Sequence, residues 1–271
     1  MHIAAIVLDL DGTLLNSAKK VSPRNLEAVL HCRERGIPVI VATARPPRTL
    51  ANMLPESLQQ LDAMIYYNGA MVVSENLGVR AHYPIEAALL AEFVDYLTDS
   101  NGDPSISVEV EDQWYSNADL DYSVLMNVTS RPQMIRLEDI RTLSASKLLL
   151  SNFDQQRVRL MVDRFGDRAN IVVTDSGELI QIMRKDVSKE SAVARLCDMW
   201  GISMREVMVF GDDYNDIGLF GTCGYPVAMG NAVEDLKQIA YEVTATNDQD
   251  GVAVVLERIL ATGCSGRTGV Q

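Results

Sequence analysis

The chain has 271 residues, of which 47% are hydrophobic and 23% charged, and its formal net charge is −13. These values are close to the averages of globular proteins, so they exclude a disordered or fibrous chain, and the length suffices for one large domain or two modest ones. The excess of acidic residues repels phosphate backbones and anionic lipid, so neither nucleic acid nor a membrane is expected as a partner.

The first eighty residues alternate short apolar runs with a helical pattern. Ser22 and Pro23 provide a helix start, and Gly36 provides its end. The apolar runs are continuous rather than alternating, which favours a parallel sheet covered on both faces. The predicted strands are Ile3–Leu8, Pro38–Ala42 and Met64–Tyr66.

The middle of the chain follows a different pattern. Ser105–Tyr115 alternates apolar and polar residues, which is typical of a strand with one exposed face. We expect a half-exposed sheet with helices on one face, in an α+β domain inserted at residues 83–183, between the two parts of a core domain formed by 1–82 and 184–271. Further predicted strands are Lys147–Leu150, Ile171–Thr174 and Leu179–Met183, and the predicted helices are Glu86–Thr98 and Gln155–Phe165.

The last part of the chain returns to the pattern of the first. Ser188–Trp200 and Val233–Ala240 are predicted helices, and Val207–Phe210 is a predicted strand. The sequence therefore predicts an α/β fold: a doubly wound, Rossmann-like parallel sheet core with an inserted α+β cap domain.

Two acidic clusters follow predicted strands directly. Asp9 and Asp11 come after the first strand, and Asp212 begins a second cluster after Val207–Phe210. The carboxyl ends of parallel strands meet at one edge of a sheet, where acids from both clusters would converge on a hard divalent cation such as Mg²⁺. The alternative for each cluster is a capping role in a polar turn.

Thr43 and Lys189 are candidates for holding phosphate. Thr43 ends a predicted strand, where its hydroxyl and the following N–H could bind a phosphoryl oxygen, although a threonine at a strand end is more often a local cap. Lys189 lies in the first turn of a predicted helix, where the helix dipole disfavours a cation unless an anion is nearby. The alternative is an exposed first-turn lysine.

The cysteines and the N-terminus indicate a reduced, cytoplasmic protein. The four cysteines, Cys32, Cys197, Cys223 and Cys264, lack the C-x-x-C spacing of zinc sites and are expected to be structural thiols. The apolar run Ile3–Leu8 is too short for a signal or membrane-spanning segment. The three histidines lie outside every motif and receive no catalytic role.

Several short motifs in order carry a resemblance to a known family. The chain resembles the haloacid dehalogenase-like hydrolases, specifically the Cof-like phosphatases with a large, type IIB cap. All of these motifs in sequence are far more specific than any one alone. They are DLDGT from Asp9, Thr43 with Arg45, Asn68-Gly69-Ala70, Ser188-Lys189, GDDYND from Gly211, Ala228 to Ala232, and NDQDGV from Asn247.

The resemblance implies roles for individual residues. Asp9 would be the nucleophile and Asp11 the general acid and base, with a raised pKa. Magnesium would be held by Asp9, the backbone carbonyl of Asp11, and Asp212, and Asp216 would orient Lys189 or a metal-bound water. The phosphate-binding residues would be Leu10, Thr43, the Ala44 N–H, Lys189 and Asn215. Ala44 replaces the glycine usual in relatives, which would cost about 1 kcal/mol if that position needs an unusual backbone angle.

The resulting prediction is a Mg²⁺-dependent phosphatase that forms an aspartyl-phosphate, with a small phosphorylated metabolite as its partner and a cap that closes over the site. A phosphomutase and a noncatalytic phosphate-binding regulatory protein are the alternatives. Sugar phosphates, phosphorylated cofactor precursors and nucleotide monophosphates all stay open as substrates, as do the cap residues that set specificity and the oligomeric state.

Overall fold

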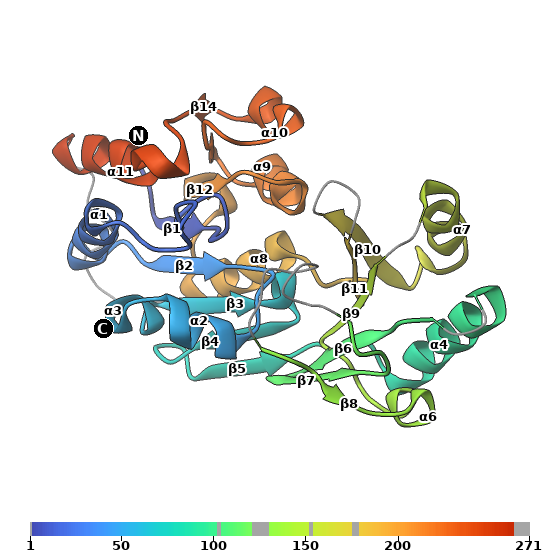
Figure 1. Ribbon diagram of the computed structural model, residues 1–271. Coiled ribbons are helices and arrows are strands. Elements are labelled where there is room, and N and C mark those ends of the chain that lie inside the picture. Colours follow the sequence, from blue (N-terminus) through green and yellow to red (C-terminus); the bar gives the residue numbers. More distant parts are fainter. Residues whose placement is uncertain (1, 102–103, 121–129, 152–153, 175–178, 263–271) are drawn as a thin grey trace. The chain divides into compact units, whose positions relative to one another are not determined.

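Figure 1 shows the computed structural model, which describes residues 2–101, 104–120, 130–151, 154–174 and 179–262. The chain divides into two compact units, residues 1–81 with 188–271 and residues 82–187, which we call the core unit and the inserted unit. The use of residues 83–183 as a cap stays a prediction. Within the described ranges, no helix has both the length and the apolar character to cross a membrane.

The core unit is built on an eight-stranded sheet in the order β14-β13-β12-β1-β2-β3-β4-β5. The pairs from β14 to β3 are parallel, and β4 returns antiparallel to β3. Every residue of β1, β2 and β12 is buried, so both faces of the sheet centre are covered. The strands are β1 Ala5–Leu8, β2 Val39–Ala42, β3 Ala63–Tyr66, β4 Met71–Ser74, β5 Val79–His82, β12 Val207–Gly211, β13 Tyr225–Ala228 and β14 Glu242–Val243.

Helices of the core unit pack on this sheet and on one another. Helix α1 begins as predicted: the Ser22 side chain accepts from the Asn25 N–H, and Pro23 is the first helical residue. It packs on α11, while α8 packs on β2 and β3. The helices are α1 Pro23–Glu34, α2 Pro47–Met53, α3 Glu56–Gln59, α8 Lys189–Trp200, α9 Ile217–Thr222, α10 Glu234–Ile239 and α11 Gly251–Ala261, and the short 3-10 turns are η1 Tyr67–Gly69, η3 Met204–Glu206, η4 Tyr214–Asp216 and η5 Asn247–Gln249.

The register of three central strands brings the acidic clusters to one edge of the sheet. Leu8 at the end of β1 is paired with Phe210 of β12 and with Val41 of β2. The Asp9 N–H continues the ladder by donating to the Phe210 carbonyl at 3.2 Å. The residues that follow β1, β2 and β12 therefore emerge side by side, as the sequence predicts.

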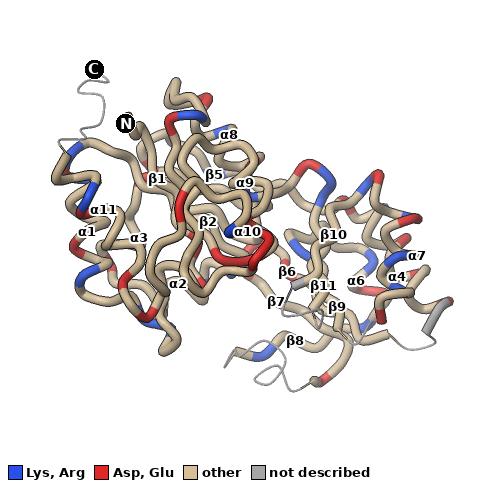
Figure 2. The backbone as a smooth tube through the Cα atoms, turned by 90° about the horizontal axis from the view of Figure 1, so that it is seen from above, with Lys and Arg blue, Asp and Glu red and all other residues tan. Residues whose placement is uncertain are grey.

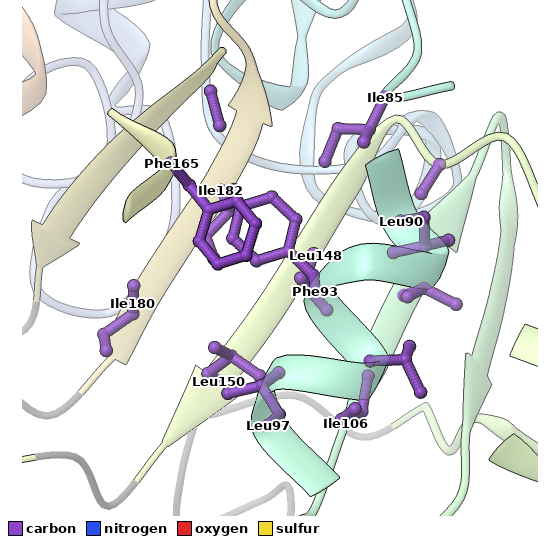
Figure 3. Close-up of a cluster of buried hydrophobic side chains, with 14 of the residues drawn as sticks. Ile85, Leu90, Phe93, Leu97, Ile106, Leu148, Leu150, Phe165, Ile180 and Ile182 are labelled. Carbon is purple, nitrogen blue, oxygen red and sulfur yellow. The ribbon is translucent and has the colours of Figure 1, made fainter. Parts of the chain in front are cut away.

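The inserted unit is a six-stranded sheet in the order β10-β11-β9-β6-β7-β8 with helices packed on it. Figure 3 shows its hydrophobic core, in which Phe93 and Phe165 stack with ring centroids 4.0 Å apart. Exposed positions of α7 carry charged residues (Figure 2). The strands are β6 Ser107–Val110, β7 Gln113–Ser116, β8 Gln133–Met134, β9 Lys147–Ser151, β10 Ala169–Thr174 and β11 Leu179–Arg184, and the helices are α4 Ala87–Asn101, α6 Leu137–Ile140 and α7 Gln155–Phe165.

The α/β fold class is confirmed, and two details of the inserted unit differ from expectation. Ser105–Tyr115 is not one strand, because the chain turns at Glu111, whose φ is 50°, and pairs β6 with β7. The sheet is also not half-exposed throughout. Glu109 and Lys147, which face away from the apolar cluster, are only 3% and 6% exposed, and Lys147 donates to the Gln181 side chain at 3.4 Å.

Candidate active site

Three carboxylates converge at the carboxyl edge of the core sheet. Asp9, Asp212 and Asp216 each offer one oxygen, and these oxygens lie within 4.8 Å of one another, a grouping that could hold a metal ion. Asp9 is 6% exposed and Asp216 is fully buried. Three buried or half-buried acids this close repel one another strongly unless cations lie among them.

Lys189 supplies one such cation. Its ammonium donates to Asp9 Oδ1 at 2.6 Å and to Asp216 Oδ1 at 2.7 Å. Ser188 caps α8 through a capping box, which places Lys189 at the first helical position. The sequence predicts that a cation there needs a nearby anion, and the two carboxylates meet that need.

The turn after β12 wraps around Asp216. Its second oxygen, Oδ2, accepts from the N–H groups of Asp212 at 3.1 Å and Asp213 at 3.3 Å. A Cβ at Gly211 would lie 2.6 Å from the Asp216 carboxyl carbon, so only glycine fits there. Asp213 and Asp216 also form the capping box of η4. The turn is thus a polar cap and a source of site carboxylates at once.

The loop after β1 encloses Asp212. The Thr13 hydroxyl donates to Asp212 Oδ1 at 2.9 Å, a contact that sequence reasoning missed although Thr13 lies in the DLDGT motif. Gly12 has φ +81°, and a Cβ there would lie 2.0 Å from Asp212 Oδ2. The glycine is therefore required both for the turn and for the close approach of the carboxylate.

Burial and mutual repulsion govern the ionisation of these groups. Burial raises the pKa of Asp9 well above its usual value, and Asp216 and Asp212 add to the effect against the opposing charge of Lys189. Burial and the charge of Asp216 raise the pKa of Asp212 to about 7, although Thr13 and Lys189 oppose the shift. Burial lowers the pKa of Lys189, but Asp216 and Asp9 outweigh it and hold that pKa above its ordinary value.

Asp11 lies in a different environment from the one predicted. Arg45 donates to both of its oxygens, at 2.5 Å from Nε and 2.7 Å from Nη2, and Lys19 donates to Oδ1 at 2.8 Å. Burial raises the pKa of Asp11, but the hydrogen bonds and charges of Arg45 and Lys19 outweigh it and lower the pKa below its usual value. The expectation of a raised pKa is wrong, because the nearest charged partners are cations rather than acids.

The strand end at Thr43 combines a local cap with a position beside the site. Its buried hydroxyl oxygen accepts from the Arg45 N–H at 3.1 Å. Ala44 does not have a positive φ; the non-glycine residues that do, among those the structure describes, are Lys19, Tyr67, Asn68, Glu111 and Asp250. Alanine in place of the usual glycine therefore adopts an ordinary backbone angle. The Leu10 side chain is fully buried, so only its backbone could bind phosphate.

Asn215 reaches a residue to which sequence reasoning gave no role. Its side-chain amide donates to Asn68 Oδ1 at 3.2 Å. Asn68 has φ 53°, and a Cβ at the following Gly69 would lie 2.4 Å from the Ser188 carbonyl oxygen. The Asn68-Gly69 turn therefore fits closely against the start of α8, and its sequence is the only signal that could have pointed to it.

The donor set fits a hard divalent cation. All three grouped ligand atoms are carboxylate oxygens, and the single Lys189 ammonium leaves their charge incompletely balanced. This group shares Asp9 and Asp212 with the predicted magnesium ligands and adds Asp216; the Asp11 carbonyl stays a prediction. Cys32, Cys197 and Cys223 are buried, reduced thiols, as expected, and Cys264 lies outside the described residues.

Comparison with known proteins gives matches along nearly the whole chain. A family model described as haloacid dehalogenase-like hydrolase matches residues 6–256. The 5-amino-6-(5-phospho-D-ribitylamino)uracil phosphatase YitU of Bacillus subtilis is 26% identical over 93% of this chain and 96% of its own. The phosphoglycolate phosphatase of Archaeoglobus fulgidus is 29% identical over 93% of this chain and 95% of its own. The subclass IIB sugar phosphatase BT4131 has the same fold, with a TM-score of 0.81 and 20% identity over 94% of this chain and 98% of its own.

Proposed function

The chain belongs to the haloacid dehalogenase-like hydrolases, and we propose that within this family it is a Mg²⁺-dependent phosphatase acting on a small phosphorylated metabolite. Two relatives along nearly the whole chain are named as phosphatases, one for a phosphorylated ribityl-uracil and one for phosphoglycolate. A sugar phosphate or a phosphorylated cofactor precursor is the substrate class that we propose. The observation that carries the mechanism is the Asp9 carboxylate, held by Lys189 and grouped with Asp212 and Asp216.

Asp9 is the proposed nucleophile. One of its oxygens attacks phosphorus, so that a bond from Asp9 to phosphorus forms while the bond to the leaving oxygen breaks. Lys189 fixes the orientation of the carboxylate through Oδ1 and supplies positive charge beside the phosphoryl oxygens. Water then attacks the aspartyl-phosphate and releases inorganic phosphate, which restores the Asp9 carboxylate.

Asp11 is the proposed acid and base. Its ionised form, held by Arg45 and Lys19, suits the second step, in which it accepts a proton from the attacking water. Donation to the leaving oxygen in the first step requires that Asp11 take up a proton, which its contacts with Arg45 and Lys19 oppose. We propose that these two contacts open before the first proton transfer.

The proposed magnesium ligands are Asp9 and Asp212 with the Asp11 carbonyl, and Asp216 stays beside Lys189. When bound, the ion neutralises charge on the transferred phosphoryl group. Hydrogen bonds within the chain orient these carboxylates: the Thr13 hydroxyl orients Asp212, and the Asp212 N–H orients Asp216. Leu10 and Ala44 through their N–H groups, Thr43, and Asn215 are proposed to bind phosphoryl oxygens. The inserted unit is proposed to be the cap that selects the substrate.

The test is hydrolysis of p-nitrophenyl phosphate by the wild type and by Asp9→Asn, with Mg²⁺ and with a chelator. We expect phosphate release that depends on Mg²⁺ and falls by about a thousandfold or more in Asp9→Asn. Glu257→Ala, which removes an exposed carboxylate from α11, is the matched control and should keep full activity. Full activity in Asp9→Asn would rule the mechanism out.

A screen of phosphorylated metabolites then identifies the substrate class. Incubation with a hexose phosphate separates the phosphatase from a phosphomutase, because the mutase would return an isomer rather than free phosphate. Absence of turnover across a broad panel of phosphate esters would favour a binding protein instead.

A further inference from the structure

Two motifs of the sequence have no part in the proposed reaction, and the structure brings them together. They are residues 228–232 (AMGNA) and 247–252 (NDQDGV). The Gly230 N–H donates to the Ala245 carbonyl at 3.0 Å, and the Asn247 N–H donates to Asn231 Oδ1 at 2.9 Å. A Cβ at Gly251 would lie 2.2 Å from the Ala245 carbonyl oxygen, so this contact tolerates only glycine.

Both motifs are hydrogen-bonded to the loop that follows β1. The Asn231 side chain donates to the Gly12 carbonyl at 2.8 Å, and the buried Asn247 side chain donates to the Leu15 carbonyl at 2.9 Å. Asp248 accepts from Ser17 twice, from its N–H at 2.7 Å and its hydroxyl at 2.6 Å. We call Asn231, Asn247 and Asp248 the C-terminal clasp, since all three fasten a loop more than two hundred residues earlier in the chain.

The loop held by the clasp has a defined turn, from which the Lys19 side chain reaches back to Asp11. The Asn16 N–H donates to the Lys20 carbonyl at 3.0 Å, and the Lys19 N–H donates to the Asn16 carbonyl at 2.8 Å. Lys19 has φ 57°, a left-handed backbone angle that a lysine seldom adopts. This turn directs the Lys19 ammonium onto Asp11 Oδ1 at 2.8 Å.

We propose that the C-terminal clasp positions the loop of residues 12–21 so that Lys19 holds the ionised Asp11 carboxylate in place for the second step, in which it accepts a proton from the attacking water. The clasp residues and Lys19 are therefore positioning residues, and the inference rests on the phosphatase function proposed above.

Exposure explains why Lys19 needs such support. Its side chain is 39% exposed, and that of Asp11 is 34% exposed. An ion pair this accessible to water contributes little on its own, because ordering two flexible side chains offsets the attraction. A loop already fixed by the clasp has lost most of that freedom, so the ammonium stays close to the carboxylate.

The kinetic consequence falls on kcat rather than KM. In the second step the ionised Asp11 accepts a proton from water, and a carboxylate that is less well oriented slows that step. Neither Lys19 nor Asp248 belongs to the residues proposed to bind phosphate, so substrate affinity should change little.

The experiment is a double-mutant cycle on the full chain with p-nitrophenyl phosphate and Mg²⁺. We expect Asp248→Ala to lower kcat about fivefold and Lys19→Met about tenfold, with KM within about twofold of the wild type. Because Asp248 acts through Lys19, the double variant should lose about tenfold, not the roughly fiftyfold of independent effects. Asp248→Asn keeps an acceptor for Ser17 and should recover most of the activity.

Glu257→Ala is the matched control. Glu257 is likewise an exposed acid that accepts two hydrogen bonds from a distant part of the chain, from Arg24 at 2.6 and 2.8 Å. Its kcat should equal that of the wild type. Unchanged kcat in Asp248→Ala, or fully multiplicative losses in the double variant, would overturn the proposal.

Hydrogen exchange separates this inference from the proposed function. Amides of the peptide covering residues 12–21 should exchange faster in Asp248→Ala than in the wild type or in Glu257→Ala. If the wild type hydrolyses no phosphate ester, the proposed function fails, and the exchange rates still test the clasp. Unchanged exchange in Asp248→Ala would overturn it.

Discussion

Replacing Lys189 by methionine tests how the core unit tolerates its acidic cluster. The Lys189 side chain is 1% exposed and donates to two buried carboxylates, at 2.6 Å to Asp9 and 2.7 Å to Asp216. Methionine keeps a long, flexible side chain but removes the charge and all of the donors. Asp9 and Asp216 then both lose the ammonium group with which they are paired.

The expected loss is large. Removing one partner of a buried ion pair destabilises a protein by about 3–5 kcal/mol, because the remaining charge is buried without compensation. For a chain of this size that corresponds to a fall of roughly 6–20 °C in melting temperature. Lys20→Met, which removes an exposed lysine, is the control and should change stability by less than about 0.5 kcal/mol.

The loss should depend on pH. Burial already raises the pKa of Asp9, and Lys189 opposes that effect. Without the lysine, the pKa of Asp9 in the folded state rises further above its value in the unfolded state. The variant therefore loses stability as pH rises from the unfolded-state pKa to the folded-state pKa. At low pH Asp9 takes up a proton and the deficit shrinks.

Urea unfolding of the wild type and of Lys189→Met, without metal and at about pH 5 and about pH 8, measures the loss of stability at each pH. The free energy of unfolding should differ by several kcal/mol at the higher pH and by clearly less at the lower one. A difference below about 1 kcal/mol at the higher pH, or equal differences at both pH values, would show that Lys189 does not compensate the buried carboxylates.

Three further predictions concern the site. The pKa of Asp212 is raised to about 7, so the protein without metal loses stability as pH rises toward 7. Because Asp212 must lose its proton to bind a cation, the rise in melting temperature caused by Mg²⁺ should be larger at about pH 8 than at about pH 6 in a thermal-shift assay. An equal rise at both pH values would contradict this prediction. Gly12→Ala places a Cβ 2.0 Å from Asp212 Oδ2 and should abolish both the Mg²⁺ effect and turnover, whereas Gly36→Ala, at φ +76° with no atom within 4 Å, should cost only about 1 kcal/mol of stability. Asp11→Asn should lower kcat/KM at least about tenfold more for an alkyl phosphate than for an aryl phosphate, because the poorer leaving group needs the proton; equal losses would argue against the acid role.

The sequence alone predicts the main features of the core unit. Continuous apolar runs locate β1, β2, β3 and β12, and the acids directly after β1 and β12 do meet at one sheet edge. Local signals also suffice for helix starts, since the Ser22 and Ser188 side chains cap α1 and α8. These features depend on neighbouring residues and on the geometry of parallel sheets, both of which a sequence carries.

The partners of Asp11 could not be predicted in the same way. Arg45 follows a different strand, and Lys19 reaches Asp11 only through a turn with a left-handed backbone angle. These contacts decide whether the pKa of Asp11 is raised or lowered, so the direction of its shift could not be derived from the sequence. The hairpin turn at Glu111 could not be predicted either. No glycine or proline marks this turn, in which Glu111 itself adopts a φ of 50°.

Asp9 is proposed to carry the phosphoryl group during turnover. Rapid quenching of the enzyme with p-nitrophenyl phosphate and Mg²⁺, followed by digestion and mass spectrometry, locates the covalent intermediate directly. We expect an added phosphoryl group on the peptide that contains Asp9, and none on that peptide in Asp9→Asn. A phosphoryl group on another residue, during normal turnover, would contradict it.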